Sequence, residues 1–196
     1  MKKSAMLGIS ALFLLSAYAL PSLAAPGPGH FAGVPWGAES ADVDQAMSQQ
    51  NAGFRHERTL EDGSIERAFD GTLADTDGEL DFTLVNGTFV QGAFQVNRPD
   101  GGEAEALAYR RFYAIISEKY GPPARTGPAP APGYAGAYAV WYGLRAPGNA
   151  GMIQVRMVYQ ATRAKCGPQL CGSRFYVQYS NLTLVKRQAA QTPDGL

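Results

Sequence analysis

Apolar residues in this chain follow two different periods. Within residues 54–96, and again at residues 153–159 and 175–179, they recur at every second position, as Leu80, Phe82 and Leu84 do. That spacing is typical of strands with one buried face. One long segment between the first two of these stretches has helical spacing instead. The sequence therefore predicts an α+β fold, in which an antiparallel sheet of about six to eight strands is covered by two helices.

Both predicted helices have recognisable ends. The first begins at Ser40, a good N-cap residue, and we expect Gly53 to end it. The second lies between Asp100, which has capping-box spacing to Glu103, and Gly121. Its apolar stripe consists of Ala104, Ala108, Phe112, Ile115 and Ile116. Because the stripe is broad, we expect this helix to lie across the sheet.

The predicted strands are separated by turn signals such as Asp62-Gly63 and Asn86-Gly87. They cover, approximately, residues 54–60, 65–69, 80–84, 90–96, 138–144, 152–159 and 175–184. In the last of these the apolar phase shifts after Tyr179, which predicts a β-bulge near Ser180 or Asn181.

Residues 122–137 hold five prolines and three glycines among 16 positions. This composition predicts a long loop without regular structure. Loops of this length are usually either functional or disordered, and the sequence leaves both possibilities open.

The N-terminus has the three parts of a secretory signal peptide. Lys2 and Lys3 form the basic region, an apolar stretch follows, and Ser22 and Ala24 are the small pair before the cut. The apolar stretch is shorter than the ~20 residues of a membrane span. We therefore expect cleavage after about residue 24, no membrane span in the mature chain, and a periplasmic or secreted location.

After the signal peptide of residues 1–24, residues 25–186 are predicted to form one domain and residues 187–196 a flexible tail. The domain divides into half-repeats at about 34–97 and 100–186, each a helix followed by strands in series. No feature of the sequence predicts its oligomeric state.

Cys166 and Cys171 are the two cysteines of the chain. Two ligands do not make a zinc site, and the spacing is not that of a Cys-x-x-Cys redox motif. In an exported protein a local disulfide is the simpler interpretation, and closing so short a loop stabilises the fold by about 2–3 kcal/mol.

Charge and motifs exclude several kinds of chemistry. Without Lys2 and Lys3 the chain has 15 basic and 17 acidic side chains, a net charge of −2, which argues against nucleic-acid binding. Neither His30 nor His56 stands in a recognisable nucleophile motif, and phosphate-binding loops are absent. The acidic run from Asp70 to Asp81 lacks the spacing of a calcium loop. We expect no cofactor, no metal site and no catalytic residue.

The opening Val34-Pro35-Trp36-Gly37, followed by Ser40 and a short helix, carries a resemblance to known proteins. With the order of elements, it resembles the small exported α/β domains of the beta-lactamase-inhibitor and outer-membrane-assembly-lipoprotein type. The resemblance implies that helices cover one face of the sheet and that the other face is offered to a protein partner. The acylated cysteine of the assembly lipoproteins has no counterpart here, and no inhibitor residue is carried over.

Four aromatic residues cluster beside the Pro-rich segment: Tyr134, Tyr138, Trp141 and Tyr142. Tyrosine and tryptophan are favoured at protein interfaces, so these four are the candidate binding surface. Strands also favour aromatic residues for their own packing. Because both faces of residues 138–142 are apolar, the strand is either buried on both sides or has one dry face and one binding face.

Together these patterns predict a non-enzymatic binding module of the cell envelope, whose partner is a protein or another envelope component. One alternative is a small secreted hydrolase with dispersed carboxylates, which requires two acids facing each other across a cleft. Another is a carrier of small apolar ligands, which requires a cavity of at least about 300 Å³.

Overall fold

The computed structural model describes residues 27–96, 103–128, 134–149, 151–162, 165–166, 169–170 and 173–191. The predicted signal peptide and the side chains of Cys166 and Cys171 lie outside the described residues. The export prediction and the disulfide prediction therefore remain predictions.

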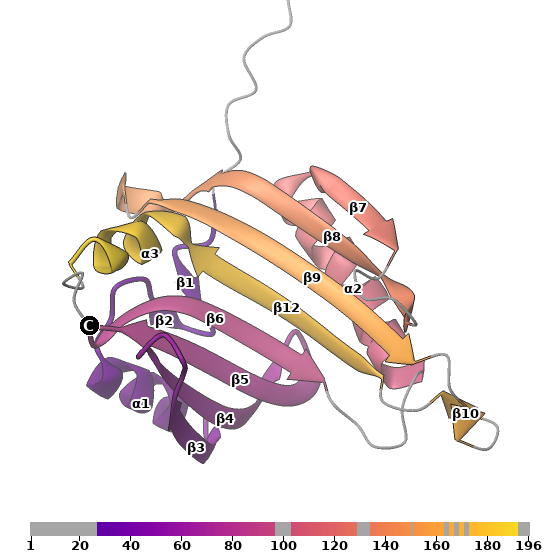
Figure 1. The fold of residues 1–196 in the computed structure, drawn as a ribbon, viewed down its shortest axis with the longest axis horizontal. Helices are drawn as coiled ribbons and strands as arrows, with labels where there is room; N and C mark the ends of the chain where they lie inside the picture. The colour runs from indigo at the N-terminus through magenta and orange to yellow at the C-terminus, as the bar shows by residue number, and fades with distance from the viewer. Residues whose placement is uncertain are drawn as a thin grey trace, which may run out of the picture.

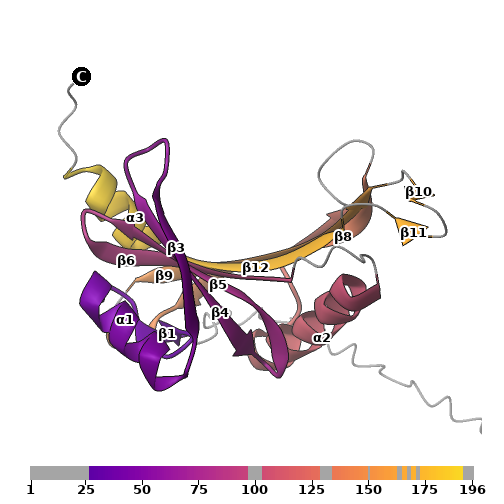
Figure 2. The same ribbon diagram turned by 90° about the horizontal axis from the view of Figure 1, so that it is seen from below.

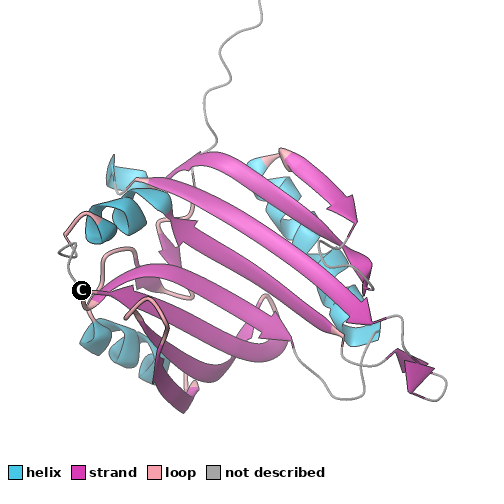
Figure 3. Ribbon diagram, in the orientation of Figure 1, coloured by secondary structure: helices cyan, strands magenta, loops and turns pink. Residues whose placement is uncertain are grey.

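An eight-stranded antiparallel sheet dominates the fold (Figure 3). Its spatial order is β3-β4-β5-β6-β12-β9-β8-β7. The strands are β3 (Gly53–Thr59), β4 (Ile65–Leu73), β5 (Thr76–Val85), β6 (Thr88–Val96), β7 (Arg125–Pro128), β8 (Tyr134–Arg145), β9 (Met152–Thr162) and β12 (Arg174–Asn181). Two small hairpins are separate from it: β1 (His30–Phe31) with β2 (Val34–Pro35), and β10 (Lys165–Cys166) with β11 (Gln169–Leu170). The predicted α+β class and strand number are confirmed.

Three α-helices accompany the sheet: α1 (Ser40–Gln49), α2 (Glu103–Tyr120) and α3 (Leu182–Ala189). Helices α1 and α2 lie on the same side of the sheet (Figure 2). Figure 1 looks at the other side, with α2 behind β7 and β8. We call this other side the open face. The helix α3 packs where the β5–β6 turn meets the start of β9. Gln188 of this helix donates one hydrogen bond to the Thr88 hydroxyl and accepts one from Asn86.

The core lies between the sheet and the two covering helices. Phe94 of β6 stacks on Phe112 of α2 with ring centroids 5.4 Å apart, and Phe175 of β12 contacts the same ring at 5.3 Å. Gly92 has a packing role, because a Cβ there would come within 2.2 Å of the Phe31 ring. The missing side chain lets Phe31 lie directly against β6.

Several expected boundaries were wrong. Gly53 does not end α1: the helix stops at Gln49, the left-handed residue is Asn51 with φ +55°, and Gly53 begins β3. The N-cap is Glu39, whose side chain forms a capping box with Asp42, rather than Ser40.

The segments expected to be irregular also contain regular structure. Residues 125–128, inside the predicted Pro-rich loop, form the edge strand β7, and β8 already begins at Tyr134. The phase shift near Ser180 and Asn181 is not a bulge but the start of α3, whose N-cap Asn181 accepts a hydrogen bond from the Leu184 N–H at 3.1 Å. This helix takes in the first residues of the expected tail.

The α2 stripe is rotated relative to the prediction. The buried side chains are Glu105, Ala108, Phe112, Ile116 and Tyr120. Ala104 is exposed, as is Ile115 at 41%. Glu105, which is not part of the predicted stripe, is buried near the start of the helix in place of Ala104.

Candidate binding face

Successive side chains of each strand point alternately into the core and onto the open face. In the centre of the sheet, Gln178 and Ser180 of β12 alternate with buried Val177. Gln178 donates to the Oε1 atom of Gln91 on the neighbouring β6 at 2.8 Å, and Ser180 donates to the same atom at 3.1 Å. In this part of the open face the polar side chains of Gln91, Gln178 and Ser180 therefore hydrogen-bond one another, and Ser180 is itself buried.

On one flank of this polar centre, β4 and β5 carry a group of carboxylates, and β6 contributes Gln95 beside them. Glu79 and Asp81 both accept hydrogen bonds from the Nε2 of Gln95, at 3.1 Å and 2.6 Å. Arg55 of β3 forms ion pairs with Glu79 and, at 3.6 Å, with Asp70. These contacts lock the acidic flank into an internal network.

Asp81 is the buried member of that network, with an exposed fraction of 4%. Burial raises the pKa of Asp81 to about 7, and the negative charges of Glu79 and Glu66 add to the rise, while the hydrogen bond from Gln95 opposes it. The Oδ1 atom of Asp81 has no hydrogen-bond partner among the described residues. Because its pKa is raised, Asp81 keeps its proton to a higher pH than an ordinary aspartate does.

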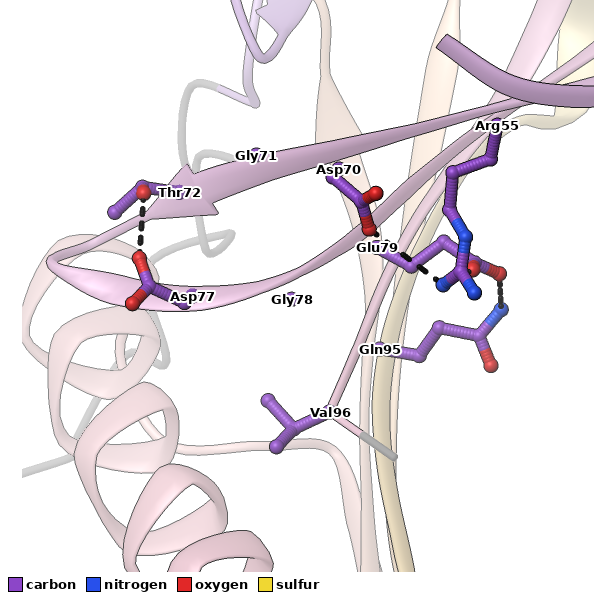
Figure 4. A pocket seen from close by; sticks show the side chains of 9 residues that line it. All are labelled: Arg55, Asp70, Gly71, Thr72, Asp77, Gly78, Glu79, Gln95 and Val96. Carbon is purple, nitrogen blue, oxygen red and sulfur yellow. Dashed lines mark hydrogen bonds and ion pairs between the residues drawn. The ribbon is translucent and has the colours of Figure 1, made fainter. Parts of the chain in front are cut away.

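A cavity of about 540 Å³ opens where the β4–β5 hairpin runs past the end of β6 (Figure 4). We call it the acidic pocket; its lining comprises Arg55, Asp70, Gly71, Thr72, Asp77, Gly78, Glu79, Gln95 and Val96. Within the acidic pocket, Asp77 accepts a hydrogen bond from the Thr72 hydroxyl at 2.8 Å, and Glu79 is held by Arg55 and Gln95. Asp81 does not line it.

A second cavity of about 540 Å³ lies on the opposite flank, over β7, β8 and β9. We call it the arginine–tyrosine pocket; its lining comprises Arg125, Pro128, Tyr138, Val140, Tyr142, Gln154 and Arg156. Its two guanidinium groups and two phenol rings distinguish it from the acidic pocket, whose lining holds three carboxylates.

Strand register fixes the layout of the arginine–tyrosine pocket. Val140 pairs with Arg125 on one side and with Arg156 on the other, so the two arginines flank it in one cross-strand row. With strands about 4.8 Å apart, their Cα atoms are roughly 10 Å apart. Tyr138 and Tyr142 precede and follow Val140 by two residues on the same strand. An apolar floor is thus framed by two cations across the sheet and two phenol rings along it.

Contacts within the pocket hold these side chains over the strands. The guanidinium of Arg125 lies 5.8 Å from the centroid of the Tyr142 ring, a cation–π contact. The Tyr138 ring lies on Gly127, since a Cβ at that glycine would come within 2.6 Å of it. Val140 is 5% exposed, whereas Tyr142 is 44% exposed. Among the described residues, no carboxylate lies within 4.0 Å of either pocket arginine.

The four aromatic residues selected from the sequence do not share one surface. Tyr138 and Tyr142 line the pocket. Trp141 is not part of this surface: it is 2% exposed, and its Nε1–H donates to the Gly121 carbonyl at 2.9 Å. Strand alternation turns it toward α2, where its ring meets Tyr113. The side chain of Tyr134 lies outside the described residues.

Sequence reasoning missed the two arginines of the pocket. Arg125 lies within residues 122–137, for which the sequence predicts a loop, and Arg156 lies in the predicted strand 152–159 without any motif that singles it out. The available signal was the turn that joins β8 and β9. Strands joined by a turn pair with each other, and in this pairing Arg156 lies opposite Val140 on the same face of the sheet. Arg125 carried no such signal.

The described residues also delimit other functions. They contain no group of three or more His, Cys, Asp or Glu side chains arranged to hold a metal ion. None of the helices in the described part of the chain is long and apolar enough to cross a membrane. A third cavity of about 370 Å³, with a largely apolar lining that includes Phe31, Phe112 and Tyr179, lies between α2 and the β1 region.

The fold and the two pockets define the class of this protein as an α+β domain in which α1 and α2 cover one sheet face and the other face is open except at the end where α3 packs. Comparison of the chain with protein-family models, with curated proteins and with solved structures returns no match.

Proposed function

We propose that this chain is an exported, non-enzymatic binding module that holds a protein or another component of the cell envelope on its open face. The observation that carries this proposal is the arginine–tyrosine pocket, a 540 Å³ hollow with two arginines that have no described carboxylate partner. Arginine and tyrosine dominate the residues that contribute most to binding free energy at interfaces. Polar side chains elsewhere on the open face, such as Gln178 and Glu79, already hydrogen-bond or ion-pair with their neighbours. We therefore assign the partner to this pocket.

The resemblance in sequence plan points the same way. Domains of the beta-lactamase-inhibitor and assembly-lipoprotein type offer the sheet face opposite their helices to a partner. The pocket lies on that face of this chain, because Val140 alternates with Trp141, whose ring meets Tyr113 of α2. Such an analogy supports the class of function and names no partner.

Capture from the envelope fraction of the source cells tests the proposal. The bait is the chain from residue 25, and the variant is Tyr138→Ala with Tyr142→Ala. Leu107→Ala is the matched control, because Leu107 is 59% exposed on α2, away from the open face. We expect one partner to be retained by the wild type and by the control and lost from the folded double variant.

Retention that is equal for the wild type and the double variant would place the binding site elsewhere and contradict the proposal. Circular dichroism of each bait shows whether it is folded. This control replaces any substitution of Trp141, whose burial would confound loss of binding with loss of stability.

A small hydrolase is the second candidate. Glu79 lines the acidic pocket and neighbours Asp81, whose pKa is raised to about 7 as a general acid requires. Against it, Asp81 is buried and does not line the pocket. Release of reducing sugars from cell-wall glycans, lost in Glu79→Gln, would favour this candidate over binding.

A carrier of small apolar ligands is supported by the volume of the third cavity, which at about 370 Å³ exceeds the lower end for ligand sites, roughly 300 Å³. Enhanced fluorescence of an apolar dye that is abolished by Ile116→Trp, a substitution that fills this cavity, would favour the carrier.

A further inference from the structure

We propose that the arginine–tyrosine pocket is an oxyanion site that takes a carboxylate or phosphate group carried on a flat ring. The inference rests on the proposed function, because it names the chemistry by which the same site holds its ligand. Its grounds are the arrangement of cations, rings and floor around Val140.

The first ground is the pair of cations. Arg125 and Arg156 lie in one row on either side of Val140, and both are exposed. Elsewhere on the sheet, Arg55 and Arg58 are ion-paired to carboxylates. Two like charges facing one hollow without a counter-ion favour an anion between them, and guanidinium groups match the two-oxygen geometry of carboxylate and phosphate.

The second ground is the spacing. Guanidinium groups on Cα atoms roughly 10 Å apart, each on a side chain several ångströms long, can both reach one oxyanion centred above Val140. The Arg125 guanidinium already leans over the Tyr142 ring. Gln154, which also lines the hollow, adds an amide N–H donor.

The third ground is the pair of rings. Tyr138 and Tyr142 stand along the strand on the two sides of the Val140 floor, so a flat group attached to the anion is received between apolar surfaces. Phenol rings contribute to binding through their area and keep a hydroxyl for hydrogen bonding. A bare anion uses only the arginines, and a neutral ring uses only the tyrosines.

The test is a calorimetric and NMR titration of the mature protein with four probes: phenyl phosphate, benzoate, inorganic phosphate and phenol. We expect saturable binding of phenyl phosphate or benzoate, at least about tenfold tighter than phenol, and weakening as salt is added. Comparison of phenyl phosphate with benzoate shows which oxyanion the site selects, and inorganic phosphate measures the contribution of the ring.

The diagnostic variant is Arg125→Gln with Arg156→Gln. Both side chains are exposed, so the fold should survive, and a thermal melt verifies it. We expect at least a tenfold loss of affinity, whereas Arg110→Gln, an exposed arginine on α2, leaves affinity unchanged.

Absence of binding at millimolar phenyl phosphate and benzoate, or equal affinity in the folded double variant, overturns the inference. Partner capture is a separate measurement. If capture still depends on the two tyrosines while no oxyanion binds, the proposed function stands and the oxyanion site does not exist.

Discussion

Replacing Asp81 by asparagine should change the pH dependence of stability in a calculable way. The folded protein holds the Asp81 pKa near 7, against the ordinary value of 3.8 in the unfolded chain. Between these two values the folded state binds a proton that the unfolded state has released, so the free energy of unfolding falls as pH rises. The contribution is fully present below pH 3.8 and is lost once pH exceeds about 7.

The size of the effect follows from the same difference in pKa. At about 1.4 kcal/mol for each tenfold change in the proton equilibrium, the ionised carboxylate destabilises the fold above pH 7 by up to about 4 kcal/mol. Asparagine has the shape of the protonated acid: its carbonyl can accept from Gln95 and its amide can donate to Glu79. Asp81→Asn should therefore be the more stable protein at pH 8.

The assay is urea unfolding of both proteins from pH 4 to pH 8. The difference between variant and wild type should be near zero at pH 4 and grow to several kcal/mol by pH 8. Asp77→Asn, an exposed acid of the same strand, should change the free energy of unfolding by less than about 0.5 kcal/mol at every pH. A difference for Asp81→Asn that does not vary with pH would refute the reasoning.

Three further substitutions test the packing of the fold by urea unfolding. Trp141→Ala removes a buried indole and should cost about 3–5 kcal/mol; a cost under about 1 kcal/mol would contradict its burial. Gly136→Ala places a Cβ 2.1 Å from a neighbouring backbone oxygen at φ +139° and should cost more than Gly63→Ala, whose Cβ meets nothing within 4 Å. Asn181→Ala removes the cap of α3 and should cost about 1–2 kcal/mol; full stability would show that the cap is dispensable.

Strand positions could be predicted because a buried face leaves a two-residue period. Leu80, Phe82 and Leu84 of β5 are buried in the protein core, as their spacing indicated. The edge strand β7 could not be predicted, because its proline is typical of a loop. At the edge of a sheet one side of the strand is free, so Pro128 is tolerated there without loss of a hydrogen bond between strands. Its neighbour β8, not its own residues, makes it a strand.

The last helix was missed for a different reason. After Asn181 the period changes from two to that of a helix, and one shifted pair of leucines is compatible with either a bulge or a turn of helix. The cap decides in favour of the helix, because the Asn181 side chain satisfies the Leu184 N–H. An asparagine immediately before a segment in which apolar and polar residues alternate with helical spacing is a usable signal for the start of a helix.

The tyrosines of the candidate site could be predicted from the sequence, and its arginines could not. Alternation separates Tyr138 and Tyr142 from Trp141, but it does not say which set faces the helix. That choice depends on where α2 docks, and its buried side meets the Trp141 side of β8. The arginines came from two strands whose adjacency to β8 is a property of the whole sheet.

The position of β12 has a consequence for how the chain assembles. It is the last strand to be synthesised, yet it lies in the middle of the sheet, where Phe175 pairs with both Val96 and Tyr159. Until residues 174–181 emerge, β6 and β9 each present an unpaired edge, a template for association with other chains. Completion of the sheet is therefore a late step that depends on contacts far apart in the sequence. A chain that ends before β12 is left with two separate sheets, β3 to β6 and β7 to β9, each with an exposed, aggregation-prone edge.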